Sequence, residues 1–134
     1  MKARTIKIFI LFIFISLAGS GTVSAQKKGK IKTITVEQFQ KKVKGSGTIQ
    51  LVDVRTPKEF TDGHLKGATN YNVLDSTLYR NISNLNRRKA VFVYCKSGAR
   101  SMRAAEQLKA AGFKVFNMEG GITNWNSKNL PTVK

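Results

Sequence analysis

The chain has 134 residues, with 24 Lys and Arg against 7 Asp and Glu, and a formal net charge of +17 at pH 7. This length fits one domain with one hydrophobic core, and the single cysteine excludes an intramolecular disulfide. The positive charge attracts anions in general, although runs of lysine most often form a solvated basic face.

The first 25 residues predict a secretory signal peptide. Three basic residues (Lys2, Arg4 and Lys7) precede an apolar run over 8–18, and small residues follow up to Ala25. The apolar run is shorter than the roughly 20 residues that a membrane span needs. We therefore expect cleavage after Ala25, with an uncleaved anchor as the alternative.

Removal of the signal peptide (1–25) would leave a flexible leader over 26–30 and one domain over 31–134. The three basic residues lost would reduce the charge from +17 to +14. We expect a periplasmic location, or else full secretion. Export argues against a nucleic-acid partner, and contact with a membrane is expected only if the signal peptide stays uncleaved. The sequence does not indicate an oligomeric state.

The rest of the chain alternates between strand-like and helix-like segments. Thr35 and Gln38 have the spacing of a capping box, and Pro57 suits the first turn of a helix. In chain order we expect a strand over 32–34, a helix over 36–45, a strand over 49–54, a short helix over 57–62, a short strand within 67–72, a helix over 76–85, a strand over 90–94, a helix over 101–111, a strand over 114–117 and a helical turn over 121–125, with order ending at 130–131.

This alternation predicts an α/β domain whose mostly parallel sheet is covered by helices on both faces. In such sheets ligands bind at the carboxyl ends of the strands. Cys95, the only cysteine, directly follows the strand over 90–94 and therefore lies at that edge.

The segment around Cys95 predicts a reactive thiol. The cysteine stands between a strand end and a helix start, where free backbone N–H groups and the helix dipole favour the thiolate. Lys96, Arg100 and Arg103 add positive charge nearby. The alternative is an inert, buried cysteine at the end of a strand.

Three motifs carry a resemblance to a known family. They are Asp53-Val54-Arg55 with Glu59-Phe60 and 63–68; Tyr94-Cys95-Lys96-Ser97-Gly98-Ala99-Arg100-Ser101; and Gly112-Phe113 with Gly120-Gly121-Ile122 and Trp125. In this order they resemble the single-domain rhodaneses of the thiosulfate sulfurtransferase superfamily, over essentially all of the chain after the signal peptide. The resemblance implies a rhodanese-like α/β fold with a five-stranded sheet, and a Cys95 that carries sulfane sulfur as a persulfide.

Sulfurtransferase activity would give each of these residues a role. Cys95 would be the nucleophile that takes sulfur from thiosulfate or a persulfide donor, with no metal and no organic cofactor. Because no second cysteine exists, the acceptor must be an external thiol or cyanide. Arg55 is placed at the rim of the active site. The anion-binding loop would consist of Lys96, Ser97, Gly98, Ala99, Arg100 and Ser101.

Several side chains have a second interpretation. Arg100 binds the donor or braces the loop, and Arg55 pairs with Asp53 or Glu59 to hold the loop after its strand. His64, the only histidine, is expected to be structural; a role as a base is the alternative, and it forms no metal site alone.

Two other functions remain open. Phosphatases and arsenate reductases on a related scaffold use a Cys and an Arg with five intervening residues, whereas four separate Cys95 from Arg100. The third reading is a non-catalytic sulfur carrier or partner-binding module.

Overall fold

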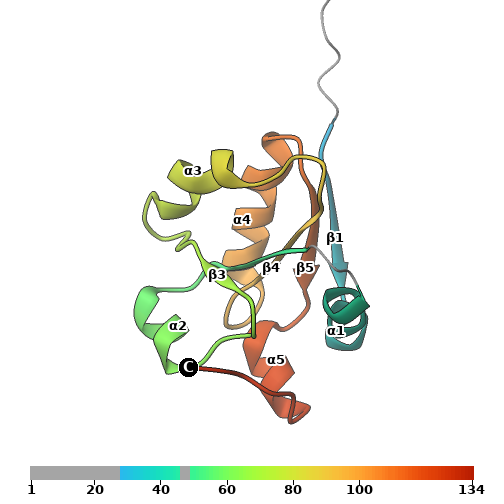
Figure 1. The fold of residues 1–134 in the computed structure, drawn as a ribbon, viewed down its shortest axis with the longest axis vertical. Helices are drawn as coiled ribbons and strands as arrows, with labels where there is room; N and C mark the ends of the chain where they lie inside the picture. Colours follow the sequence, from blue (N-terminus) through green and yellow to red (C-terminus); the bar gives the residue numbers. More distant parts are fainter. Residues whose placement is uncertain (1–27, 46–48) are drawn as a thin grey trace, which may run out of the picture.

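The computed structural model describes residues 28–45 and 49–134, so the expected signal peptide and the start of the leader lie outside the described residues. The elements alternate along the chain (Figure 1). They are β1 (Lys30–Ile34), α1 (Val36–Gly45), β2 (Gln50–Asp53), α2 (Pro57–Asp62), β3 (Thr69–Asn70), α3 (Thr77–Asn81), the 3-10 helix η1 (Ile82–Asn84), β4 (Val91–Tyr94), α4 (Ala99–Ala110), β5 (Lys114–Met118) and α5 (Gly121–Ser127).

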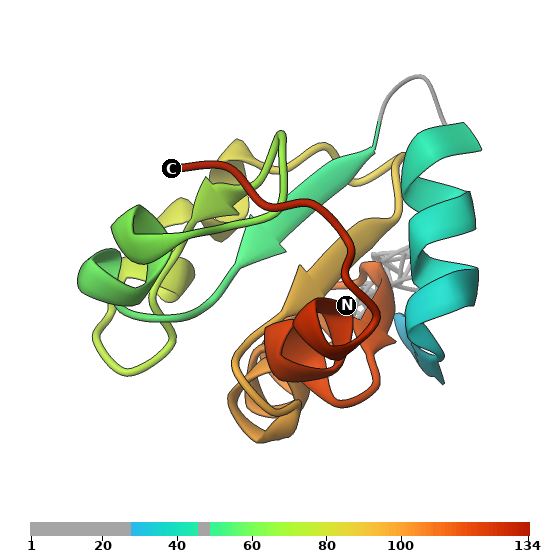
Figure 2. The ribbon, with the colours of Figure 1, turned by 90° about the horizontal axis from the view of Figure 1, so that it is seen from below.

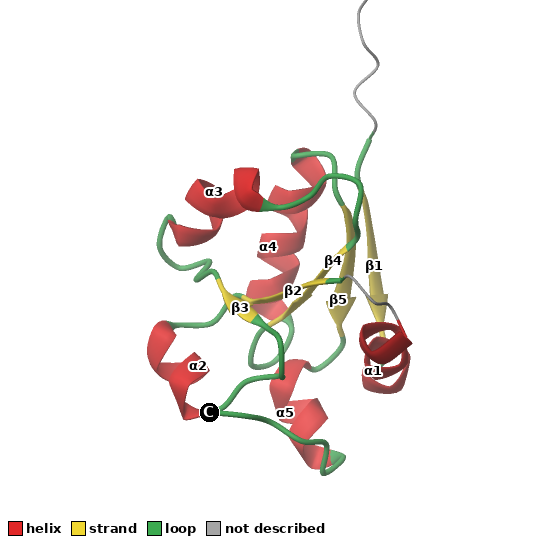
Figure 3. Ribbon diagram, viewed as in Figure 1, coloured by secondary structure: helices red, strands yellow, loops and turns green. Residues whose placement is uncertain are grey.

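The five strands form one sheet in the order β1-β5-β4-β2-β3, and every pairing between them is parallel (Figure 3). Parallel neighbours need a crossover connection, which the intervening helices supply. The expected α/β class with helices on both faces is therefore confirmed. β4 lies at the centre of the sheet, and this position brings Cys95 to the middle of its carboxyl edge.

Each face of the sheet has its own hydrophobic cluster. All four residues of β4 are buried, and successive side chains point to opposite faces. Val91 and Val93 pack with α3 and α4, whereas Phe92 and Tyr94 pack with α1 and α5. Figure 2 shows α1 on one side of the sheet, well separated from α2 and α3.

Local sequence signals explain where the helices begin. Thr35 and Gln38 exchange the two hydrogen bonds of the expected capping box. Thr56 and Glu59 form a second capping box ahead of Pro57. Among the described residues, no helix is long and apolar enough to cross a membrane.

Several boundaries differ from the sequence-based expectation, and long-range contacts explain two of the differences. β1 begins inside the expected leader, since the N–H of Lys30 donates to the carbonyl of Phe113 at 3.1 Å. The segment expected as one helix over 76–85 divides into α3 and η1. Order continues past residue 131, because Val133 and His64 exchange two backbone hydrogen bonds.

Gly121 couples the start of α5 to the loop after β4, and this contact can be tested. The φ of Gly121 is +60°, and an added Cβ would overlap the carbonyl oxygens of Cys95 and Lys96. We expect Gly121→Ala to lower the free energy of unfolding in urea by about 3–4 kcal/mol, from left-handed strain and steric overlap together.

Gly67→Ala is the matched control. Gly67 also has a positive φ, +86°, but nothing lies within 4 Å of an added Cβ. This variant should show only the strain of about 1–2 kcal/mol. Equal losses in the two variants would contradict a steric coupling between α5 and the Cys95 loop.

Candidate active site

Cys95 lies where β4 ends, and three residues later Gly98 caps the start of α4. The residue is only 1% exposed to solvent. Lys96 and Ser97 of the intervening loop are exposed, and so is Ala99, the first residue of α4. The sulfur thus sits beneath a short exposed loop at the carboxyl edge of the sheet.

Two donors lie within hydrogen-bond distance of the sulfur. The N–H of Gly98 donates to Cys95 Sγ at 3.0 Å, and Ser101 Oγ is 3.4 Å from the same atom. Ser101 Oγ is also 3.0 Å from the carbonyl oxygen of Gly98. Because a hydroxyl has one proton, a negatively charged sulfur competes with that carbonyl for it.

These donors change the acidity of the thiol. Burial raises the pKa of Cys95, but hydrogen bonds from the Ser101 hydroxyl and from the N–H groups of Ser101, Gly98 and Ser97 together lower it below its ordinary value. The expected stabilisation of the thiolate therefore has a geometric basis. Its main source is hydrogen bonding by the loop and the first turn of α4.

Gly98 has a backbone conformation that turns its N–H toward the sulfur. Its φ of +106° and ψ of −19° lie in the left-handed region, which favours glycine. Ser101 is completely buried and faces Cys95 from the first turn of α4.

Arg100 binds Glu59 of α2 through both terminal nitrogens of its guanidinium. Arg100 Nη1 lies 2.8 Å from Glu59 Oε2, and Nη2 lies 2.8 Å from Oε1. Glu59 also accepts a hydrogen bond from the N–H of Thr56 at the start of α2. This is the loop-bracing arrangement, which joins α2 to the active-site loop. The donor contact expected of Arg100 stays a prediction.

Arg55 binds Asp53, one of the two partners considered for it. Arg55 Nη2 lies 2.6 Å from Asp53 Oδ2 and 2.7 Å from the carbonyl oxygen of Gly63. Asp53 is fully buried and Arg55 is 5% exposed. The buried carboxylate thus holds the guanidinium, although Arg55 still lines a surface hollow together with Glu59 and Ile122. Its expected place at the rim of the active site stays a prediction.

His64 makes structural contacts. Its Nδ1 lies 2.9 Å from the carbonyl oxygen of Phe60, and its ring stacks on the Phe60 ring with centroids 3.7 Å apart. Its backbone pairs with Val133. Within residues 28–45 and 49–134, no group of three or more His, Cys, Asp or Glu side chains has the placement of a metal site.

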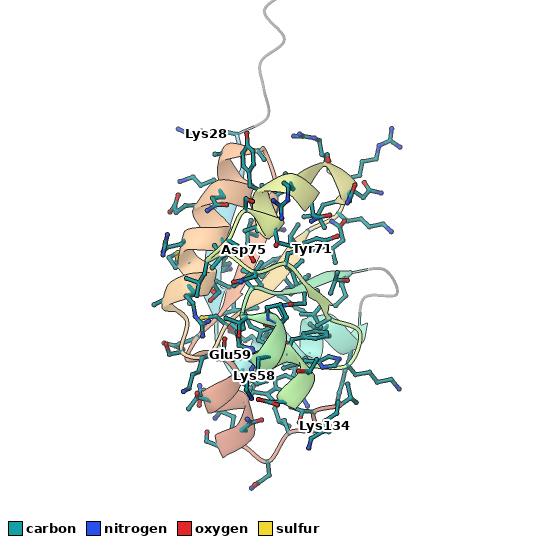
Figure 4. All side chains as sticks on the ribbon, turned by 90° about the vertical axis from the view of Figure 1, so that its left-hand side faces the viewer. Lys28, Lys58, Glu59, Tyr71, Asp75 and Lys134 are labelled. Carbon is teal, nitrogen blue, oxygen red and sulfur yellow. The ribbon has the colours of Figure 1, made fainter. Side chains whose placement is uncertain are left out.

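Two parts of the site were missed at the sequence level. The start of α5 braces the loop, since the N–H groups of Ile122 and Thr123 donate to the carbonyls of Cys95 and Lys96. Glu59 is the partner of Arg100, 41 positions away in the chain. Only the capping-box spacing of Thr56 and Glu59 could have pointed to an ordered Glu59. In Figure 4, Glu59 and Lys58 lie on α2, on the face turned to the viewer.

The hydroxyl of Ser101 provides a test of the thiolate. Ser101→Ala should raise the pKa of Cys95, because it removes a donor to the charged sulfur. The pH dependence of Cys95 alkylation by iodoacetamide should then shift to higher pH. Ser97→Ala, at an exposed side chain whose backbone N–H is retained, should leave the curve in place. Identical curves for Ser101→Ala and the wild type would exclude the hydroxyl as a donor.

The Arg100–Glu59 pair should make stability depend on pH. The hydrogen bonds from Arg100 lower the pKa of Glu59 from 4.5 to about 2. A lowered folded-state pKa stabilises the fold above pH 4.5, and this contribution is lost as the pH falls from 4.5 through about 2.

Glu59→Gln should therefore lower the free energy of unfolding at neutral pH by about 2 kcal/mol. The difference from the wild type should shrink as the pH falls, in urea titrations at matched ionic strength. Asp62→Asn removes the acid of an exposed ion pair with Lys58 and should have little effect. A difference for Glu59→Gln that is constant with pH would contradict the ionic contribution.

Comparisons with known proteins agree with this architecture. A model of the rhodanese-like domain matches residues 35–128. The protein YqhL of Bacillus subtilis is 37% identical over 99 residues, which cover 73% of this chain and 75% of YqhL. A protein of Allochromatium vinosum named sulfurtransferase is 31% identical over 104 residues, covering 77% of this chain and 95% of that protein.

A solved structure also matches. The crystal structure of a rhodanese-related protein from Thermoplasma volcanium has a TM-score of 0.68 and 29% identity, and the match covers 76% of this chain and 97% of that chain. Relatives of the chain carry the names sulfurtransferase and putative sulfur carrier protein. The chain belongs to the rhodanese-like domain family.

Proposed function

We propose that this protein is a sulfurtransferase that moves sulfane sulfur through a persulfide on Cys95. The observation that carries the proposal is the convergence of the Gly98 N–H and the Ser101 hydroxyl on Cys95 Sγ, at 3.0 and 3.4 Å. These donors support a thiolate, which is the nucleophilic form of cysteine. The relatives named sulfurtransferase support the same reaction class.

The first half-reaction takes sulfur from an anionic donor such as thiosulfate. The Cys95 thiolate attacks the outer sulfur of thiosulfate, and a new S–S bond forms to Cys95 Sγ. The S–S bond of thiosulfate breaks, and sulfite leaves with the electron pair. The charges balance, because a thiolate and a dianion become a persulfide anion and a dianion. A persulfide donor reacts in the same way and leaves as a thiolate.

The second half-reaction returns the enzyme to its starting state. A thiolate or cyanide attacks the outer sulfur of the Cys95 persulfide, and the Cys95 thiolate leaves with the electron pair. A persulfide or thiocyanate is the product. Because Cys95 is the only cysteine, it has no partner within the chain, so the acceptor comes from outside. Two successive displacements should give ping-pong kinetics.

The geometry favours sulfur over phosphate as the transferred group. Cys95 is 1% exposed, so a small terminal sulfur atom is better suited to reach it than a tetrahedral phosphate ester. The two terminal nitrogens of Arg100 bind Glu59, so its planar fork is occupied by a carboxylate. A phosphatase or arsenate reductase would use that fork to bind its oxyanion.

A dedicated sulfur carrier is the alternative that the relatives support. A Bacillus subtilis protein named putative sulfur carrier protein YrkF is among them. A carrier would form the same Cys95 persulfide but would deliver it once to a specific partner. Repeated turnover with thiosulfate and a small thiol distinguishes an enzyme from a carrier.

The persulfide can be detected by intact mass. After treatment with thiosulfate, the wild type should gain the mass of one sulfur atom, and cyanide should remove it with formation of thiocyanate. Cys95→Ser should show no gain and no transfer while it unfolds at a similar urea concentration. Absence of the adduct with both thiosulfate and persulfide donors would refute the proposal.

A further inference from the structure

The side of the sheet covered by α1 carries a cluster of six lysines, which we call the lysine face. Two surface hollows of ≈ 430 and ≈ 220 Å³ adjoin there and share Lys42 as a lining residue. Lys30 is the direct neighbour of Lys114 in the register of β1 and β5. The lysine face consists of Lys30, Lys32, Lys41, Lys42, Lys89 and Lys114.

The positive charge of the lysine face is not neutralised locally. Within the described parts of the chain, no acidic residue lines either hollow. Glu37, one turn before Lys41 on α1, lies 2.6 Å from Lys128 Nζ and is thereby paired with another lysine. Among the described residues, no ion pair involves a member of the lysine face.

Two of these lysines lie over an aromatic ring. The Nζ atoms of Lys42 and Lys114 each lie 5.1 Å from the centre of the Phe116 ring. Phe92 stacks on Phe116 with ring centres 4.9 Å apart. The aliphatic stems can cover this apolar surface while the ammonium groups face solvent.

We propose that the lysine face binds the surface of an anionic phospholipid bilayer. The face contains only lysine, which presents a point charge to many headgroups, and no arginine, which suits bidentate recognition of one group. A cluster of four to eight basic residues on an amphipathic helix is typical of binding to anionic lipid, and the amphipathic helix α1 contributes Lys41 and Lys42 to the face. The six ammonium groups are spread over β1, β5, α1 and the loop before β4, which suits a surface of many headgroups better than one small soluble anion. This contact does not depend on the signal peptide, unlike the membrane contact expected from the sequence.

Binding in this way leaves the active site free. α1 lies on the right of Figure 1, and α2, whose Glu59 holds the active-site loop, lies on the left with the sheet between them. Figure 2 shows the same separation. The lysine face therefore turns toward the lipid while α2 stays on the other side of the sheet and the Cys95 loop stays at its carboxyl edge.

The test uses the chain over 26–134, so that the apolar run does not contribute. Both hydrophobic clusters lie within the described residues, and the Thermoplasma structure consists almost entirely of the matched region, so this part folds without residues 1–25. It should co-sediment with vesicles of phosphatidylcholine and phosphatidylglycerol, but not with phosphatidylcholine alone. High salt should release it.

The triple variant Lys42→Gln, Lys89→Gln, Lys114→Gln should bind phosphatidylglycerol vesicles on the order of 100-fold more weakly. The control Lys58→Gln, Lys66→Gln, Lys134→Gln removes the same charge elsewhere and should bind nearly as the wild type does. Both variants should unfold at urea concentrations close to that of the wild type.

Four results would overturn the proposal. Equal losses in the two triple variants would indicate a general effect of net charge. Equal binding of the lysine-face variant and the wild type would exclude this face. Failure of the chain to bind anionic vesicles, or lysine-dependent binding to a soluble acidic protein alone, would exclude a bilayer as the partner.

Discussion

The hydrogen bonds that converge on the sulfur of Cys95 are the constraint on which the rest of the site depends. Burial at the end of a central strand raises the cost of a negative charge there, and 1% exposure leaves almost no water to offset it. The N–H of Gly98 and the first turn of α4 take the place of that water, and the pKa of Cys95 falls below its ordinary value. A persulfide on the same residue is also an anion and would use the same donors.

Donors can stabilise an anion only if the loop that carries them is held still, and two helices outside the loop do this. α2 holds it through the pair of Glu59 and Arg100, which spans the gap between the first and second motifs. α5 holds it through the N–H groups of Ile122 and Thr123, with Gly121 allowing the close approach. The three motifs, distant in the sequence, therefore meet in one small structure around Cys95.

Most of the exposed positive charge lies away from the Cys95 site. The site relies mainly on hydrogen bonds, and Arg100 in the first turn of α4 is paired with Glu59. Many of the lysines lie on or beside α1 instead, where six of them form a face without acids lining its hollows. Salt screens interactions between exposed charges, so it should weaken anion binding by the lysine face. It should affect the hydrogen bonds from the loop and α4 to Cys95 much less. The fold can thus combine local chemistry with a separate attraction to anions.

Periodicity and capping act over a few residues, so the amino-acid sequence was enough to predict the α/β class, the order of the elements, the capping box at Thr35 and the position of Cys95 at a strand end. It also carried the family, through motifs of fixed local spacing. Three pairings became visible in the folded domain alone: Arg100 with Glu59, the buried Arg55 with Asp53, and Val133 with His64. On sequence grounds, several carboxylates could pair with each of these arginines. The packing of the whole domain selects one of them. For the same reason, six lysines spread from residue 30 to residue 114 become one surface only when the strands and α1 assemble.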